Sequence, residues 1–349
     1  MTPFKIRHGN LPILDLIRFS AALLVLFGHA RGVLLVGIDS VSEPNVFIRA
    51  FYLISGVQHE GVVLFFVVSG FLVGGSIWEQ MKQRRFKTAS YLLSRFTRIY
   101  LVYIPALMVV GVITVVGVTF LADTRLFAER PLFPSGVSAG WTLEQIPCHL
   151  LSVQGVLCGA WGADPPLWSL GFEWTFYLLA PAAFAAILAP MQNVARIMWS
   201  VALVSIIYVL HRINASFDQW FAIWLLGVVA SVVARRWLVP LPAALAGLAL
   251  CFIAMILSRT KFLLPDTTDA MVAIGLTLAL SCRTLIEWNF SSRTIDRGAR
   301  FSYSLYLVHL PLVSWSAQCL SASPGGLPRS FSPTDAALQP LRLWSVLRC

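Results

Sequence analysis

The chain has 349 residues, of which 58% are hydrophobic and 12% are charged, and its mean hydropathy is +0.77. Soluble domains contain roughly 25% charged residues, so this composition excludes a soluble domain and indicates an integral membrane protein with small loops. The formal net charge of +10 arises from Lys and Arg residues spread over short loops. That spread follows the positive-inside rule and does not indicate a nucleic-acid-binding surface.

Residues 11–30 predict the first membrane-spanning helix, and they include Asp15, Arg18 and His29. About 20 apolar residues cross a bilayer, but a charge at its centre costs at least ~2.5 kcal/mol on insertion scales. Arg18 and His29, eleven residues apart, project from nearly one face with roughly 16 Å between them along the axis. Asp15 can pair with Arg18 across one helical turn. Three ionisable groups on one span favour a functional site over a structural ion pair with an interfacial histidine.

Further apolar stretches predict an all-α, polytopic fold with about nine to ten membrane helices. A strongly basic stretch, residues 82–98, separates the second span from the third. The later spans are expected at 61–78, 99–121, 167–189, 197–211, 218–234, 238–258, 269–287 and 301–319. Residues 1–319 then form one membrane-embedded domain. Residues 320–349, rich in Ser, Pro and Gly, are expected to be a poorly ordered tail.

Residues 146–160 are apolar but too short for an ordinary crossing, and they decide the topology. If this segment does not cross and the N-terminus is inside, the inner loops hold most of the Lys and Arg residues; if it crosses, the bias disappears. We therefore expect a re-entrant segment, a cytoplasmic N-terminus and a multi-pass protein of the cell (inner) membrane. The six cysteines form no CxxC pair, so no metal site is expected. Buried apolar cysteines are favoured over a disulfide for Cys148 and Cys158.

Five motifs occur in order along residues 1–319. They are LDLIRFSAALLVLFGHA with Arg18 and His29, GVVLFFVVSGFL with Ser69, SRFTRIY with Arg95 and Arg98, LWSLGFEWTFYLLAP with Glu173, and FSYSLYLVHLPL at 301–312. In this order and at these spacings they resemble the membrane acyltransferase-3 family, whose members O-acylate sugars of polysaccharides, glycans and natural products. The resemblance implies transfer of an acyl group, most simply acetyl, from a cytoplasmic acyl-CoA to a carbohydrate hydroxyl.

The resemblance and the chemistry of acyl transfer together assign roles to the motif residues. His29 is the candidate base, because imidazole titrates near neutral pH. Arg95 and Arg98, on one helical face, are the candidate contacts to the phosphates of the donor. Arg18 lies deeper and either holds the pantetheine of the donor or polarises its thioester carbonyl.

The remaining motif residues are assigned less directly. Ser69, with the glycines after it, lets the second span approach a neighbouring helix or a slender substrate, and we count it as a donor-site residue. Glu173 either orients His29, as the third member of a relay does, or holds the sugar. His309, in YLVHLP, is interpreted as a satisfied polar residue more readily than as a catalyst.

The chain departs from the family pattern at three places. Val63 stands where members often have Asp, which removes a polar group near the mouth of the site and is expected to affect the choice of acceptor. Gly171 and Phe172 stand where Ser-Val is frequent. The Ser/Pro-rich end replaces a further hydrophobic helix, so a truncated or frame-shifted, inactive protein is an alternative.

Two other functions compete with the enzyme. A proton-coupled transporter of a lipid-linked sugar or small anion would use the charges of the first span as an ion path, but its expected repeat of interrupted helices is missing from the sequence. A catalytically inactive sensor or scaffold is supported only by the unusual end of the chain.

Overall fold

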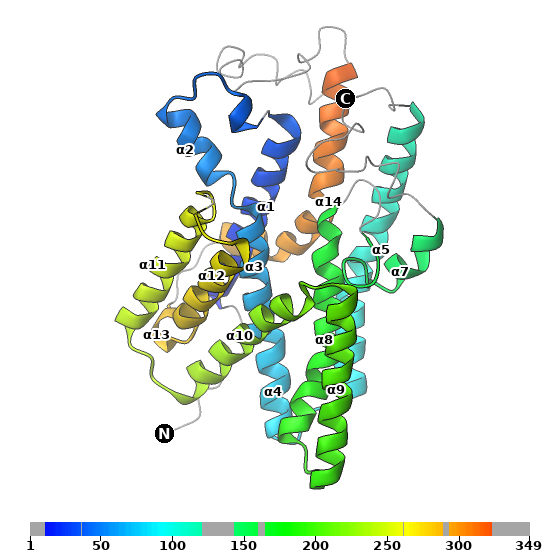
Figure 1. The fold of residues 1–349 in the computed structure, drawn as a ribbon, viewed down its shortest axis with the longest axis vertical. Helices are drawn as coiled ribbons and strands as arrows, with labels where there is room; N and C mark the ends of the chain where they lie inside the picture. The colour runs from blue at the N-terminus through cyan, green and yellow to red at the C-terminus, as the bar shows by residue number, and fades with distance from the viewer. Residues whose placement is uncertain are drawn as a thin grey trace.

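A computed structural model describes residues 11–35, 37–120, 143–159, 165–260, 262–288 and 293–322. Within these ranges the regular structure is helical, with no strand beyond one isolated bridge between Gln154 and Cys158. The all-α prediction is therefore confirmed (Figure 1). Most of the predicted tail, residues 320–349, lies outside the described residues, and its disorder stays a prediction.

The first half of the chain supplies the helices that carry five of the predicted site residues. They are α1 (Pro12–Leu34), α2 (Val46–Ile54), α3 (Gln58–Ser69), a π-helical segment (Gly70–Gly74), α4 (Gly75–Lys82) and α5 (Thr88–Phe120). The second half contains α7 (Ile146–Leu150), α8 (Trp168–Leu188), α9 (Asn193–Ile213), α10 (Phe217–Arg236), α11 (Leu241–Leu257), α12 (Pro265–Leu280), α13 (Arg283–Ile286) and α14 (Arg293–Ala322). Three short 3₁₀ turns occupy Ile38–Ser40, Leu143–Gln145 and Pro165–Leu167.

Six of the described helical segments are long and apolar enough to cross a membrane. They match the first six expected spans and lie within Pro12–Ser40, Val46–Lys82, Thr88–Val116, Pro165–Leu188, Asn193–Ile213 and Phe217–Arg236. Helices α11, α12 and α14 occupy the places of the other three expected spans, but α11 has 17 residues and α12 has 16. The polytopic fold is thus confirmed, and a total of about nine to ten spans stays a prediction.

The expected span at 269–287 is two helices, because α12 ends at Leu280 and α13 begins at Arg283. The Arg283 side chain donates hydrogen bonds to the carbonyl oxygens of Ala234 and Arg235, at the end of α10. A helix end leaves carbonyls without partners in its own helix, and an arginine can satisfy them. The break between α12 and α13 therefore places the Arg283 guanidinium at the end of α10, where the last carbonyl oxygens need hydrogen-bond donors.

The backbones of α3 and α10 approach closely in the middle of the molecule (Figure 1). A Cβ added to Gly70 would lie 1.9 Å from the carbonyl oxygen of Trp224, and one added to Gly227 would lie 2.0 Å from that of Val67. Only glycine fits at such crossings, so the small residues after Ser69 serve to admit a neighbouring helix, as one of the two sequence interpretations proposed. The contact also brings Trp224 beside Ser69.

Helices α1 and α14 run in parallel and pack side by side (Figure 1). Near their N-terminal ends Gly298 lies against the ring of Phe19, where an added Cβ would come within 2.5 Å of a ring atom. Ten residues further along α1 and eleven further along α14, His29 and His309 are in contact. This register is what brings a histidine from each end of the chain to the same place.

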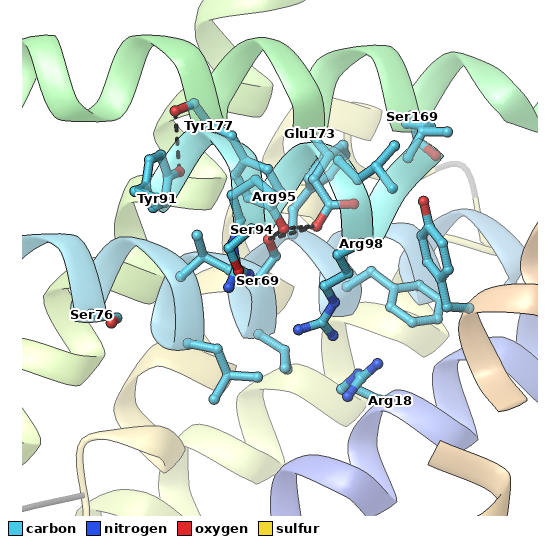
Figure 2. Close-up of a pocket in the computed structure, with 18 of the residues that line it drawn as sticks. Arg18, Ser69, Ser76, Tyr91, Ser94, Arg95, Arg98, Ser169, Glu173 and Tyr177 are labelled. Atoms are coloured by element: carbon cyan, nitrogen blue, oxygen red, sulfur yellow. Dashed lines mark hydrogen bonds between the residues drawn. The ribbon is translucent and has the colours of Figure 1, made fainter. Parts of the chain in front are cut away.

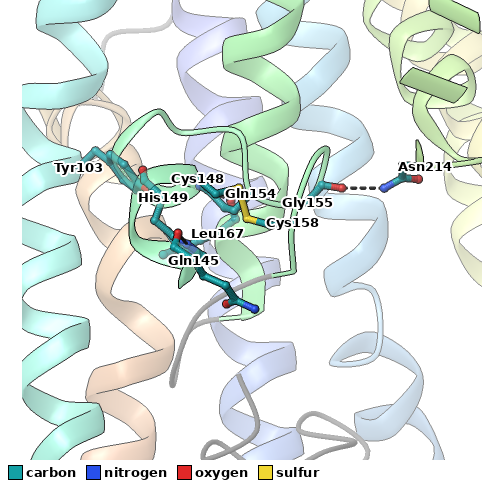
Figure 3. The surroundings of a disulfide bond; sticks show 9 residues. All are labelled: Tyr103, Gln145, Cys148, His149, Gln154, Gly155, Cys158, Leu167 and Asn214. Atoms are coloured by element: carbon teal, nitrogen blue, oxygen red, sulfur yellow. Dashed lines mark hydrogen bonds between the residues drawn. A yellow bond between two sulfur atoms is a disulfide. The ribbon is translucent and has the colours of Figure 1, made fainter. Parts of the chain in front are cut away.

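The segment after α7 forms a stapled loop rather than a crossing (Figure 3). Helix α7 has five residues, about 8 Å at 1.5 Å per residue, which is far below the roughly 30 Å of a bilayer core. The chain then turns back at Gly155, whose φ is +80°, and a disulfide joins Cys148 to Cys158. The preference for two apolar free cysteines was therefore wrong, because the reversal of the chain brings the two thiols together.

Hydrogen bonds fasten this loop to the surrounding helices (Figure 3). Tyr103 of α5 donates to the carbonyl oxygen of His149 at 2.8 Å, and Asn214 donates to that of Gly155 at 2.6 Å. Gln154 donates to the carbonyl oxygen of Leu167 at 3.0 Å, directly before α8. Burial lowers the pKa of His149, so its ring packs in the neutral form. The loop therefore fixes the start of the helix that carries Glu173.

Candidate active site

Glu173 is the centre of a partly buried hydrogen-bond network that includes Ser69 and Tyr177 (Figure 2). Ser69, the last residue of α3, donates from Oγ to Glu173 Oε1 at 2.7 Å, and Tyr177, one turn along α8, donates to the same oxygen at 2.5 Å. Trp224 of α10 donates from Nε1 to Ser69 Oγ at 3.2 Å. A carboxylate oxygen that accepts several hydrogen bonds is held in one orientation. Glu173 also lines the neighbouring cavity.

A cavity of about 520 Å³ adjoins this network. Its walls combine apolar and aromatic side chains of α3, α5, α8 and α14 with cationic side chains of α1, α5 and the turn after α4. The cationic side chains are those of Arg18, Arg85, Lys87, Arg95 and Arg98, and Glu173 is the one carboxylate among the described lining residues. The cavity is therefore electropositive and suits an anionic ligand.

Arg95 and Arg98 of α5 face this cavity without a carboxylate partner in the part of the chain that the structure describes. The Nε of Arg95 is buried and makes no hydrogen bond to a described residue, and its guanidinium carbon lies 6.0 Å from the centre of the Tyr91 ring. A buried guanidinium nitrogen that lacks a partner is costly unless a ligand supplies one. These two arginines are therefore placed to bind an anion.

Arg18 and Arg98 approach each other from α1 and α5 (Figure 2). Both line the large cavity and also a second one of about 330 Å³, which includes Asp15, Asp296 and Arg300. The predicted pair of Asp15 and Arg18 is present, but its closest N–O distance is 3.9 Å, at the limit of an ion pair. Arg18 thus keeps much of its charge available, and an anion between Arg18 and Arg98 would relieve their repulsion.

His29 does not line the large cavity but lies one layer behind its wall. His29 Nδ1 is 2.7 Å from Nε2 of His309, which is buried, and the centre of the His309 ring is 5.8 Å from that of Tyr306. Tyr306 lines the cavity, and its hydroxyl is 2.6 Å from Oγ of Ser169, at the start of α8. The histidine pair therefore adjoins the end of the cavity where α8 begins.

The sequence profile of the acyltransferase-3 family, described as an acyltransferase domain, matches residues 11–344 of the chain. The chain belongs to the acyltransferase-3 family. It is also similar to the acyltransferase MdmB of Streptomyces mycarofaciens, with 24% identity over 97% of this chain and 88% of that protein. No solved structure matches the chain. The protein is an acyl-transferring membrane enzyme, and its cavity and polar network are features of that enzyme.

The fold gathers most of the predicted site residues of this acyltransferase around one cavity. Arg18, Ser69, Arg95, Arg98 and Glu173 all line it, although they come from four helices. The roles assigned to these residues stay predictions.

One predicted relationship needs correction. Glu173 was one candidate for orienting His29, but among the described residues its side-chain partners are Ser69 and Tyr177. The residue in hydrogen-bond contact with His29 is His309, which sequence reasoning interpreted as a satisfied polar residue. Tyr306 and His309 are three residues apart, one helical turn, and that spacing in the last motif is the signal that could have linked them.

Proposed function

We propose that the enzyme transfers an acyl group, most simply acetyl, from a cytoplasmic acyl-CoA to a hydroxyl of a carbohydrate. The observation that carries the proposal is the electropositive cavity, which extends from Lys87 near the start of α5 to Tyr306 next to the histidine pair. An acyl-CoA matches these two ends of the cavity, because it has phosphates at one end and a thioester at the other.

The donor phosphates bind at the cationic end of the cavity in this proposal. Arginine presents several N–H groups in a fixed fork that matches phosphate geometry, so Arg95 and Arg98 are the main contacts. Arg85 and Lys87, on the turn between α4 and α5, line the same end. The uncharged pantetheine arm then follows the apolar wall formed by Phe65 and its neighbours on α3.

Arg18 belongs to the donor-binding part of the site rather than to the reacting centre. Arg18 and His29 are roughly 16 Å apart along the axis of α1, and a donor to the developing oxyanion must lie about 3 Å from it. Arg18 therefore holds the donor, while His29 acts at the thioester. Glu173, fixed by Ser69 and Tyr177, offers its remaining oxygen to a polar group of either substrate.

In this proposal the stapled loop indicates the orientation of the protein in the membrane. Disulfides persist in oxidising compartments and are rare in the cytosol, so we infer that Cys148 and Cys158 face the outside. The N-terminus and the turn between α4 and α5 are then cytoplasmic, where acyl-CoA is present. The carbohydrate hydroxyl approaches His29 from the opposite side of the membrane, and the inner membrane of a bacterial cell provides this arrangement.

The test uses purified protein in nanodiscs with radiolabelled acetyl-CoA and a pool of membrane glycans. We expect loss of thioester and an equal amount of labelled acetyl ester in the carbohydrate fraction. S-acetylpantetheine, which has the same thioester without the adenosine phosphates, should be used far less efficiently. Equal efficiency with the two donors would contradict the phosphate site, and label found only in lipid or protein would contradict the carbohydrate acceptor.

A further inference from the structure

The contact between His29 and His309 constrains which nitrogen of each ring carries a proton, because a neutral imidazole has one N–H donor and one unprotonated nitrogen. His309 is 2% exposed, and its Nδ1 lies 2.7 Å from the carbonyl oxygen of Tyr306 in the same helix. Its Nε2 lies 2.7 Å from Nδ1 of His29. One contact of His309 is to a carbonyl oxygen, which can only accept a hydrogen bond. The other is to Nδ1 of His29, which donates or accepts according to the tautomer of that ring.

The carbonyl oxygen of Tyr306 accepts hydrogen bonds and cannot donate one. Nδ1 of His309 must therefore carry the proton, and in the neutral ring Nε2 is left with only a lone pair. Since Nε2 of His309 can then only accept, Nδ1 of His29 must be the donor. This order leaves Nε2 of His29 unprotonated. A backbone carbonyl on α14 thus determines, through two rings, which nitrogen of His29 is free.

A charged form of His309 would reverse the order but is disfavoured by its surroundings. The ring is enclosed between α1 and α14 with no carboxylate partner among the described residues. Burying an unpaired cation is far more costly than burying a neutral, hydrogen-bonded ring. The packing therefore supports two neutral rings, in which His29 donates to His309 and His309 donates to the carbonyl oxygen of Tyr306.

We propose that His309 is a positioning residue that holds His29 in the Nδ1–H tautomer, so that Nε2 of His29 is the base. The inference rests on the proposed acyl transfer. The acceptor hydroxyl gives its proton to Nε2 while its oxygen forms a bond to the thioester carbonyl carbon. The carbon–sulfur bond breaks, and the departing thiolate takes the proton from Nε2. His29 returns to its starting form, and the products are an ester and a free thiol.

This pairing differs from a relay that uses a carboxylate. His309 is neutral, so it sets the tautomer and direction of the His29 ring without adding a charge to stabilise an imidazolium. A replacement that keeps an acceptor near the position of Nε2 should therefore preserve most of the function. Glutamine is such a replacement, since its amide oxygen can reach the place of Nε2, whereas leucine has a similar volume and no acceptor.

The direct test is ¹⁵N NMR of histidine-labelled full-length protein in nanodiscs, with the His29 signals assigned by their loss in His29→Gln. In wild-type protein and in His309→Gln we expect the Nδ1–H tautomer of His29. In His309→Leu we expect the Nε2–H tautomer or a mixture. His211→Gln is the matched control, because His211 pairs with Asp218 at the end of α9 and should leave the His29 signals unchanged. An Nε2–H tautomer in wild-type protein, or an unchanged tautomer in His309→Leu, would overturn the proposal.

A kinetic measurement separates positioning from folding and from the proposed function. Loss of a general base, or a base in the wrong tautomer, lowers rates by roughly 10²–10⁴-fold. We expect His309→Leu to lower kcat by that order with an unchanged KM for acetyl-CoA, and His309→Gln to restore kcat to within about tenfold of wild type. Equal kcat losses in both variants would contradict positioning. The NMR result does not depend on turnover, so absence of thioester use by wild-type protein would refute acyl transfer and leave the pairing intact.

Discussion

Arg95 and Arg98 face the cavity without a carboxylate partner among the described residues. Arg95 has a buried nitrogen without a described partner, and Arg98 shares two cavities with Arg18. A structural arginine has acceptors within the protein, as Arg259 has in Glu60 at 2.8 Å and Arg283 has in the carbonyl oxygens at the end of α10. The contrast between these two kinds of arginine within one chain supports donor binding by Arg95 and Arg98.

Replacing Arg95 should weaken donor binding without impairing the chemical step. A hydrogen bond to a charged group contributes about 1.5–3 kcal/mol, so Arg95→Ala should raise the KM for acetyl-CoA by about 10- to 100-fold with little change in kcat. Arg212→Ala, at an exposed position near the end of α9, is the control and should behave as wild type. The measurement is steady-state release of thiol, and an unchanged KM in Arg95→Ala would refute the phosphate contact.

The carboxylate network makes a prediction about stability that is independent of substrate. Ser69 and Tyr177 donate to one oxygen of Glu173, so removal of both donors should differ from the sum of the single effects. Ser69→Ala and Tyr177→Phe should each destabilise the protein by about 1–3 kcal/mol.

A double-mutant cycle with thermal unfolding in detergent measures this coupling. The combination of Ser69→Ala and Tyr177→Phe should show an interaction of at least about 0.5 kcal/mol. Ser76→Ala is the control for the loss of a serine hydroxyl, because Ser76 lies on α4 outside the network. Strict additivity of the two network variants would show that they do not act on a common group.

Part of the site could be predicted from the sequence, and part depends on packing. The motifs predicted that Arg18, Ser69, Arg95, Arg98 and Glu173 would share a site, and one cavity contains them all. The partner of His29 could not be predicted from local spacing, because 280 residues separate it from His309. Only the register of α1 against α14 brings the two rings together, and that register depends on packing such as that of Phe19 against Gly298.

At the scale of elements, the crossing of α3 and α10 determines where Ser69 and Trp224 meet. The crossing requires glycine on both sides, since Gly70 contacts the backbone of α10 and Gly227 contacts that of α3. The π-helical segment begins directly after Ser69, and such segments are frequent at functional sites. Ser69 donates to Glu173 of α8, and Gly70, the next residue, lies against the backbone of Trp224 in α10.

A methyl group at this crossing should separate the two helices. Gly70→Ala should lower the melting temperature of the purified protein by several degrees and reduce acyl transfer, because overpacking costs about 1–3 kcal/mol or more when backbone atoms collide. Gly37→Ala is the control, since an added Cβ there meets nothing within 4 Å. If both variants melt at the wild-type temperature, the close approach of α3 and α10 is not as the structure describes it.

The loop after α7 shows why local sequence reasoning missed the disulfide. Its apolar composition suited an interfacial or re-entrant segment, and its two cysteines looked like ordinary apolar residues. The disulfide depends on the reversal at Gly155, which lies against Trp168 and allows no side chain. A positive φ of this kind is readily adopted only by glycine, but a single glycine in an apolar run does not predict a reversal by itself.

For the whole molecule, the orientation in the membrane connects the donor site to the reaction. The cationic end of the cavity lies near the turn between α4 and α5, whereas the histidine pair lies toward the end of α1 that leads to α2. If the stapled loop is outside, the donor enters from the cytoplasm and the acceptor from the other side. The proposed reaction therefore depends on the topology as well as on the residues.

Thiol labelling in intact cells tests this topology. In a variant whose other four cysteines are replaced by serine, we expect Cys148 and Cys158 to react with a membrane-impermeant maleimide only after mild reduction. Gln192→Cys, in a variant without other cysteines, lies in the turn between α8 and α9 and should be labelled only after the membrane is permeabilised. Labelling of position 192 in intact cells would place the N-terminus outside and reverse the proposed direction.

In the proposed reaction of this acyltransferase, His29 is the base for transfer from acyl-CoA to a carbohydrate. The most direct measurement compares wild-type protein with His29→Ala in liposomes that contain membrane glycans and labelled acetyl-CoA, with matched melting temperatures as evidence of folding. We expect thioester loss and labelled carbohydrate with wild-type protein and neither with His29→Ala. If folded His29→Ala retained more than a few per cent of the transfer, His29 would not be the base and the account of the site would be wrong.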